Sequence, residues 1–484
     1  MPAATWVVLM FLVILGTMVA LMIRAGGSKA YGDWAVSHIK TKSGALWSTF
    51  ILAIVLGVDD YFNNLTTGNV MRPVADGHHI SRAKLSYMCD ATAAPVCIMM
   101  PVSSWAAAVT GVIGNEEVGF QIFLRAIPFN YYAILTLVFI IVMTCLNIDY
   151  GPMRTHELNA AKGDLYTTPE RPFENAAEMK FNPDGKVIDL VIPVIILIIG
   201  CVSSMIYVGF QNGGHDLITA FANTSAFDAL PLGSLIALII NMIYFMVRRS
   251  MKFTELMDCL PEGFKQMVPA ILILCLAWTI GDVTKGLGAP EFVAGIVKNL
   301  SGSLYALLPA VVFIIAAFLG FATGTSWGTM GTMGVALMGI GFGLDMNPAM
   351  TAGAILSGAY FGDKMSPLSD TTNLAPAMAG TDVIAHVKAM MIPTVVTYAI
   401  TLVVFGVFGA MQYHGGEADM SRVTEFAAAL NAAEGGVFNI NPILLLPPVI
   451  VIVAVAMKMP AIPGITPRDL CGCCFGFDFP TQRL

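Results

Sequence analysis

The sequence predicts an all-α, polytopic membrane protein of about 10–12 transmembrane segments, including broken or re-entrant half-helices, in two related halves. Three observations predict this fold class. The 484-residue chain is 56% hydrophobic and only 12% charged, whereas a soluble domain carries roughly 25% charged residues. Several apolar runs approach the roughly 20 residues that cross a bilayer. Polar clusters containing glycine and proline interrupt other apolar runs, as broken membrane helices require.

Three kinds of segment alternate along the chain. Plain spans are predicted at 6–23, 129–146, 191–210, 230–247, 391–410 and 443–457, and the apolar run 304–321 leads into a polar interruption at 323–329. Two stretches, 28–43 and 252–267, have the pattern of amphipathic interfacial helices. Two further apolar runs, 45–58 and 269–280, are too short to cross alone and end in polar residues. The net charge of −7 and the lack of a dense basic patch exclude a nucleic-acid-binding protein.

The predicted organisation has two transmembrane halves and a hydrophilic connection. The boundaries are 1–146 for the first half with its polar motif 59–76, 147–189 for the hydrophilic connecting loop, 190–460 for the second half with its motif 358–373, and 461–484 for an atypical tail. Basic residues after the span 230–247 predict that this end faces the cytoplasm.

The motif 358–373 organises the second half. It contains two carboxylates, a lysine and several hydroxyls between apolar flanks, and its glycine and proline predict a break in the helix. A nine-residue segment of it, 362–370, aligns with 68–76, with Gly, Met, Pro and Asp matching in place. Paired broken segments at corresponding positions of two halves indicate a transporter binding site.

Acids, amides and hydroxyls in these segments are the predicted ion- or substrate-binding residues. The candidates are Asp59, Asp60, Asn63, Asn64, Asp76, Asp90, Thr92, Thr323, Thr325, Ser326, Asp363, Ser366, Ser369, Asp370, Thr371, Thr372 and Asn373, with Asp60, Asp363 and Asp370 as candidate Na⁺ ligands. Hard cations prefer oxygen ligands. A buried carboxylate that titrates near neutral pH can hold either a proton or Na⁺, which suffices for exchange. We expect these groups, from two separated parts of the chain, to meet in one dry chamber.

Each cluster also has a plainer interpretation. Asp59 and Asp60 could be solvated acids of a surface loop, and Lys364 could pair with Asp363 in a structural role. The small residues of 323–329 could serve close helix packing alone. These alternatives remain open at this level.

The chain resembles the NhaC-type sodium/proton antiporter family of the ion-transporter superfamily. The resemblance rests on the segment 362–372, which is similar to that family's signature, and on 59–63, 68–76, 90–95 and 323–329. It covers roughly residues 5–460 and implies Na⁺/H⁺ exchange. Some relatives exchange malate for lactate with coupled cations. Compared with that family, we expect a chain trimmed at both ends, with a polar segment after Pro463.

The leading function is therefore a secondary transporter that exchanges Na⁺ for H⁺ by alternating access, not an enzyme. The alternative is a Na⁺/H⁺-coupled antiporter of small organic anions, which needs a cation such as Arg72, Lys84 or Lys364. A water-filled channel is a further option. An intramembrane aspartyl protease is disfavoured, because that signature places two glycines closer together than in 358–363. We expect no cofactor, Na⁺ and H⁺ as transported ions, and a multi-pass protein of the cell membrane. Expected partners are the lipid bilayer, a small carboxylate and a second copy in a homodimer.

Overall fold

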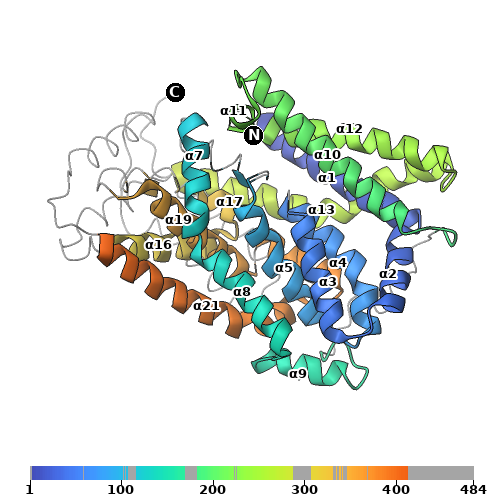
Figure 1. Ribbon diagram of the computed structural model, residues 1–484, viewed down its shortest axis with the longest axis horizontal. Coiled ribbons are helices and arrows are strands. Elements are labelled where there is room, and N and C mark those ends of the chain that lie inside the picture. Colours follow the sequence, from blue (N-terminus) through green and yellow to red (C-terminus); the bar gives the residue numbers. More distant parts are fainter. Residues whose placement is uncertain are drawn as a thin grey trace. The chain divides into compact units, whose positions relative to one another are not determined.

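The computed structural model describes residues 3–412, apart from 58, 102, 104, 107–108, 110–115, 169–181, 223, 225, 287–306, 331–333, 335–336, 339–340, 342–345 and 368. Every regular element in this part of the chain is a helix (Figure 1). The helices are α1 Ala3–Arg24, α2 Gly27–His38, α3 Lys42–Val55, α4 Asp60–Gly77, α5 Arg82–Met99, α7 Glu116–Ala126, the 3-10 helix η1 Ile127–Phe129, α8 Tyr131–Leu146, α9 Gly151–Ala160, α10 Ile188–Gln211, α11 Leu217–Ala222, α12 Ala226–Val247, α13 Phe253–Gly286, α16 Leu308–Thr323, α17 Ser326–Thr329, α19 Pro348–Met365, α20 Asp370–Ala379 and α21 Val383–Gln412.

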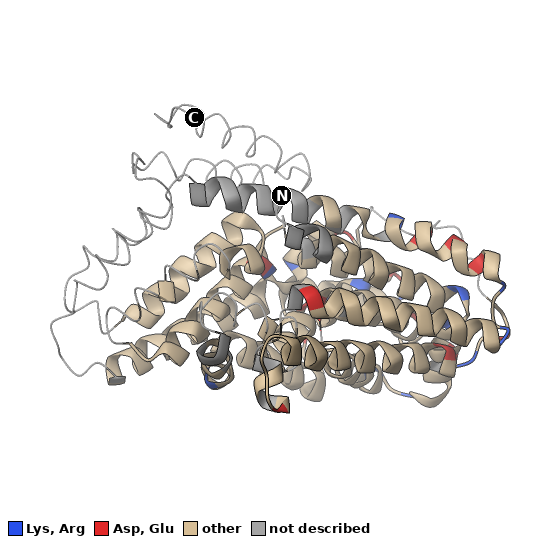
Figure 2. Ribbon diagram, turned by 90° about the horizontal axis from the view of Figure 1, so that it is seen from above, with Lys and Arg blue, Asp and Glu red and all other residues tan. Residues whose placement is uncertain are grey.

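The helices confirm the predicted fold class. In the described residues, three helices are long and apolar enough to cross a membrane, or up to five if two bent helix pairs each count as one span. Two shorter apolar helices, Lys42–Val55 and Leu308–Thr323, add half-length segments. Figure 2 shows how few Lys, Arg, Asp and Glu residues interrupt the helical ribbon. The predicted span 443–457 lies outside the described residues, so the total of about 10–12 segments stays a prediction.

The chain divides into two compact units that are interleaved in sequence. Unit 1 comprises 1–111, 136–271 and 373–393, and unit 2 comprises 112–135, 272–372 and 394–484. Each unit therefore draws on both ends of the sequence.

In unit 1, α10 and α12 run side by side (Figure 1). A Cβ atom added to Gly200 would lie 2.8 Å from the carbonyl oxygen of Gly233, so only glycine permits this approach. At one end of the pair, the fully buried Asp189 accepts two hydrogen bonds from Arg248, at 2.5 and 3.0 Å. The outer faces carry exposed isoleucines such as Ile199, which suit contact with lipid.

Also in unit 1, α9 lies within the hydrophilic connecting stretch and packs against α5. Its Glu157 is buried and accepts hydrogen bonds from the backbone N–H and the hydroxyl of Ser81, the N-cap of α5. Glu157 also pairs with Lys42 and lies 3.8 Å from Lys84. The buried Lys84 pairs more closely with Asp149, at 2.6 Å. This ionic cluster fixes where α5 begins.

In unit 2, the core is the packing of α16 against α19. Small residues bring the two backbones together, because a Cβ atom added to Gly320 would lie 2.6 Å from the carbonyl oxygen of Ala359. Cβ atoms added to Gly358 and Gly362 of α19 would lie even closer to carbonyl oxygens of α16, those of Phe313 and Ala317. Such close backbone approach is how membrane helices associate without a hydrophobic driving force.

Candidate functional site

The first polar cluster forms where α3 ends and α4 begins. Residues 56–59 separate the two helices. The break frees carbonyl groups in the last turn of α3, and these need partners when they are buried. One is satisfied locally, because the side-chain amide of Asn63 donates to the carbonyl oxygen of Ala53 at 2.6 Å. The broken backbone is therefore built into the fold.

We call Asp59, Asp60, Asn63 and Asn64 the α4 cluster. Both carboxylates are buried, with exposed fractions of 4% for Asp59 and 1% for Asp60. The indole N–H of Trp105 donates to one oxygen of Asp60 at 3.1 Å, and the backbone N–H of Tyr61 donates to the other at 3.1 Å. Burial of these acids removes the interpretation of Asp59 and Asp60 as a solvated surface loop.

One member of the α4 cluster has an unfilled hydrogen-bonding capacity. Asn64 is fully buried, and neither its side-chain oxygen nor its nitrogen has a hydrogen-bond partner among the described residues. On a helix, Asn64 shares a face with Asp60, four residues earlier. Thr66, two residues later, also has a buried hydroxyl without a partner in this part of the chain. Leaving such groups unsatisfied costs about 1–3 kcal/mol each. A ligand oxygen or a cation bound at Asn64 or Thr66 would therefore be stabilised.

Other predicted residues of unit 1 lie apart from this cluster. Asp76 is near the opposite end of α4, about 24 Å from Asp60 at 1.5 Å per residue, where it forms a two-pronged pair with Arg82 at 2.9 and 3.2 Å. Thr92 donates its hydroxyl to the carbonyl oxygen of Met88 within α5, at 2.6 Å.

Asp90 lies beside a residue that the sequence analysis did not select. A carboxylate oxygen of Asp90 lies 3.3 Å from Nε2 of His386, near the start of α21, and both side chains are buried. Nδ1 of the same imidazole lies 2.9 Å from the hydroxyl of Ser86. No short motif flags His386, because its partners are 296 and 300 positions away in the sequence.

The second polar cluster lies in unit 2, where Asp363 near the end of α19 meets the start of α17. One oxygen of Asp363 accepts hydrogen bonds from the backbone N–H of Ser326 at 3.0 Å and from its hydroxyl at 2.5 Å. Gly324, in the left-handed conformation with φ of 68°, ends α16 and turns the chain into α17. The short hydrogen bond from the hydroxyl to this buried carboxylate is of the strong, charge-assisted kind.

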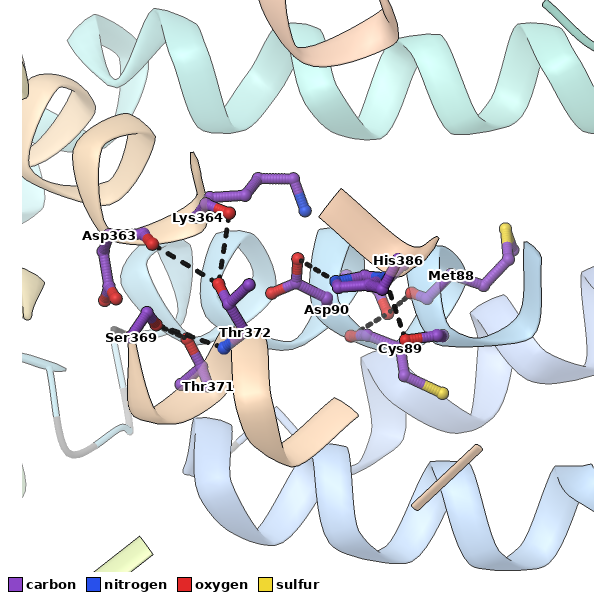
Figure 3. A network of polar contacts seen from close by, with 11 residues as sticks. Met88, Cys89, Asp90, Asp363, Lys364, Ser369, Thr371, Thr372 and His386 are labelled. Carbon is purple, nitrogen blue, oxygen red and sulfur yellow. Dashed lines mark hydrogen bonds and ion pairs between the residues drawn. The ribbon is translucent and has the colours of Figure 1, made fainter. Parts of the chain in front are cut away.

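The break after α19 supplies the other members of this cluster. Ser369 caps α20, because its hydroxyl accepts from the backbone N–H of Thr372 at 3.1 Å, and it also contacts the hydroxyl of Thr371 at 3.1 Å. The hydroxyl of Thr372 donates toward the carbonyl oxygens of Asp363 and Lys364, at 3.3 and 3.1 Å. Figure 3 shows how these side chains gather around the end of α19. We call Ser326, Asp363, Ser369, Thr371 and Thr372 the α19 cluster.

The remaining candidates of the second half have other positions. Thr323 and Thr329 are in hydroxyl contact at 3.2 Å, and Thr325 caps α17. Ser366 is buried in the break, and Asn373 belongs to unit 1. Asp370 begins α20, but its side chain lies outside the described residues. Among the described residues, no group of three or more His, Cys, Asp or Glu could hold a metal ion.

The two aligned nine-residue segments differ in conformation. The first, 68–76, is entirely helical inside α4, with Pro73 in the helix, whereas the second, 362–370, crosses the break between α19 and α20. The structure indicates a different correspondence. In each copy an apolar helix, α3 or α19, is followed by a short break and then by a second helix, α4 or α20, that begins at Asp60 or Asp370. The corresponding pattern is Asp-x-x-Asn in both copies.

Comparison with known proteins identifies the family. The sequence profile of the Na⁺/H⁺ antiporter family matches residues 96–410 and 358–468. The chain belongs to the Na⁺/H⁺ antiporter family. This membership confirms the resemblance drawn from its motifs, and with the apolar helices it makes the chain a membrane protein.

Individual relatives of this antiporter-family chain cover different shares of it. An uncharacterized protein of Haemophilus influenzae is 32% identical over 403 residues, which are 79% of this chain and 75% of that protein. The malate-2H⁺/Na⁺-lactate antiporter of Bacillus subtilis is 37% identical over 234 residues, 48% of each chain. The Na⁺/H⁺ antiporter NhaC of Alkalihalophilus pseudofirmus is 31% identical over 221 residues, 46% of each chain. The last two matches therefore span about half the length of those relatives.

Proposed function

We propose that this member of the Na⁺/H⁺ antiporter family exchanges Na⁺ for H⁺ by alternating access, as a multi-pass protein of the cell membrane. The observation that carries the proposal is the α4 cluster, in which buried carboxylates lie beside the amide of Asn64 that has no partner in the described part of the chain. Broken helices with oxygen-rich breaks are where secondary transporters bind ions.

In unit 1, Asp60 and Asn64 are the proposed Na⁺ ligands. Trp105 and the backbone of Tyr61 hold the carboxylate of Asp60 in place. A Na⁺ ion at the amide oxygen of Asn64 would replace the missing hydrogen bond there and neutralise the buried negative charge. Hard cations select such oxygen ligands.

In unit 2, Asp363 and Asp370 are the proposed Na⁺ ligands. Asp363 has one carboxylate oxygen engaged by Ser326, which orients the side chain. Asp370 is the first residue of the helix after the break. The hydroxyls of Thr371 and Thr372 add oxygen ligands of the kind that replace a hydration shell.

A second candidate function is the coupled exchange of a small organic anion, such as malate or lactate. Lys364 favours it, because this lysine is a buried cation in the last turn of α19, beside the break in unit 2. A lysine ammonium group forms strong, charge-assisted hydrogen bonds with carboxylates, which are the groups that such a substrate carries. The Bacillus subtilis relative is named as a malate-2H⁺/Na⁺-lactate antiporter.

The test is a proteoliposome assay with an internal pH-sensitive dye. We expect pulses of Na⁺ to drive proton movement in the absence of any organic anion, and pulses of K⁺ to have little effect. Proton movement that needs malate or lactate would instead support the second candidate. Asp60→Asn should abolish the Na⁺ response, whereas Asp33→Asn, which removes a carboxylate that is 68% exposed, should leave it intact. A full Na⁺ response in Asp60→Asn would refute the proposed site.

A further inference from the structure

A buried imidazole in unit 1 has a hydrogen-bonding group at each ring nitrogen. His386 has an exposed fraction of 0% and lies in the first turn of α21. Nδ1 is 2.9 Å from the hydroxyl of Ser86, and Nε2 is 3.3 Å from a carboxylate oxygen of Asp90. Figure 3 shows the contact between His386 and Asp90.

Local sequence and helix geometry build this arrangement. Ser86 and Asp90 are four residues apart on α5, which puts them on one face of that helix. Asp382 caps the start of α21 by accepting from the backbone N–H of Ala385 at 3.0 Å. The guanidinium group of Arg82, the first residue of α5, lies 3.4 Å from the carbonyl oxygen of Gly380, just before α21. The two helix starts are thus tied together near the imidazole.

His386 can accept a proton and keep its hydrogen bonds to both Ser86 and Asp90. In the neutral imidazole, one nitrogen donates and the other accepts, so Nε2 donates to Asp90 while the hydroxyl of Ser86 donates to Nδ1. In the protonated imidazole both nitrogens donate, and the hydroxyl of Ser86 rotates to accept. Protonation also changes the charge of the Asp90–His386 pair from −1 to zero, and burial favours the neutral pair.

We propose that His386, held by Asp90 and Ser86, is the binding site of the exchanged proton, separate from the sodium-binding oxygens of the α4 cluster. This inference rests on the proposed function. Because α4 packs along α5, a sodium ion in the α4 cluster and a proton on His386 repel each other through a medium of low dielectric constant. Binding of one ion then weakens binding of the other without a shared carboxylate.

Other ionisable groups near the site have separate environments. On α5, Cys89 is buried next to Asp90, and Lys84 is paired with Asp149. On α21, Lys388 is exposed two residues after His386. Asp90 supplies a charged group in hydrogen-bonding contact with the imidazole.

The experiment uses the purified, detergent-solubilised full chain. A pH-sensitive dye in weak buffer measures the protons released when Na⁺ is added, and a parallel assay measures the binding of ²²Na⁺. We expect His386→Gln, which keeps hydrogen-bonding capacity but cannot carry the charge, to bind Na⁺ and to lose proton release. In proteoliposomes the same variant should retain Na⁺/Na⁺ exchange and lose Na⁺-driven proton movement. The matched control is His38→Gln, because His38 is exposed, and it should behave as the wild type.

Ser86→Ala provides a second measurement in a chain that keeps the imidazole and Asp90. Both forms of the imidazole lose their hydrogen bond to Ser86, but the bond of the charged form is the stronger of the two, so the midpoint of proton release should move to lower pH by about one unit. If His386→Gln releases as many protons as the wild type, or if Ser86→Ala leaves the midpoint unchanged, the assignment of His386 is overturned. If the wild type itself shows no Na⁺-evoked proton release or Na⁺-driven proton movement, the proposed function fails and not only this assignment.

Discussion

The hydrogen bond between Ser326 and Asp363 gives the sharpest quantitative prediction for unit 2. Ser326→Ala removes the hydroxyl that donates to Asp363 at 2.5 Å and keeps the backbone N–H at 3.0 Å. Because Asp363 is 3% exposed, water cannot readily replace the lost donor. A hydrogen bond to a charged group contributes about 1.5–3 kcal/mol, so the ionised carboxylate is destabilised by that amount.

Sodium binds the ionised carboxylate and not the protonated one. Destabilisation of the ionised Asp363 should therefore weaken sodium binding and change the sodium dependence of exchange. At about 1.4 kcal/mol per factor of ten, the half-saturating Na⁺ concentration of Ser326→Ala should rise about 10- to 100-fold. The assay is Na⁺-driven proton movement in proteoliposomes at fixed pH, over a range of Na⁺ concentrations.

Ser357→Ala is the matched control for this prediction. Ser357 is also a buried serine of unit 2, but its hydroxyl donates to the neutral amide oxygen of Asn130 at 2.9 Å. This variant should lose about 1 kcal/mol of stability with an unchanged half-saturating Na⁺ concentration. If Ser326→Ala and Ser357→Ala have the same Na⁺ dependence, the hydrogen bond from Ser326 to Asp363 does not contribute to sodium binding.

Three further predictions address packing, pH dependence and the break. Gly68→Ala places a Cβ atom 2.6 Å from Cβ of Met378, and overpacking should lower the stability by about 1–3 kcal/mol. Thermal unfolding in detergent measures this, with Gly406→Ala as the control, because its new Cβ atom would lie 3.8 Å from Cδ2 of Leu307, an ordinary van der Waals contact. Burial lowers the pKa of His156, so the folded chain binds fewer protons than the unfolded chain and stability falls as pH drops below about 6.5. His156→Gln should flatten that loss; an unchanged pH dependence would contradict it. Asp370→Asn should abolish Na⁺-dependent proton movement in vesicles with expression intact, and undiminished exchange would exclude the assigned role.

The sequence predicted the membrane fold and the breaks because both depend on local properties. Long apolar runs such as 191–210 need no knowledge of tertiary structure, since the bilayer acts as their solvent. Pro367, between Ser366 and Ser369, likewise marks the end of α19. The alignment of 68–76 with 362–370 did not predict that the two segments have different conformations. Pro73 lies inside the helix α4, and the chain breaks before Asp60 and not at Pro73.

The sequence by itself determined that this chain is a helical membrane protein, that its apolar runs are broken, and that acids cluster at the breaks. Only the tertiary structure decided which side chains meet. Ser326 reaches Asp363 across 37 positions because glycines let α16 and α19 approach closely. His386 reaches Asp90 across 296 positions because the starts of α5 and α21 are tied together. Hydropathy depends on residues one at a time, whereas a hydrogen bond between helices depends on how two backbones pack, which no local pattern encodes.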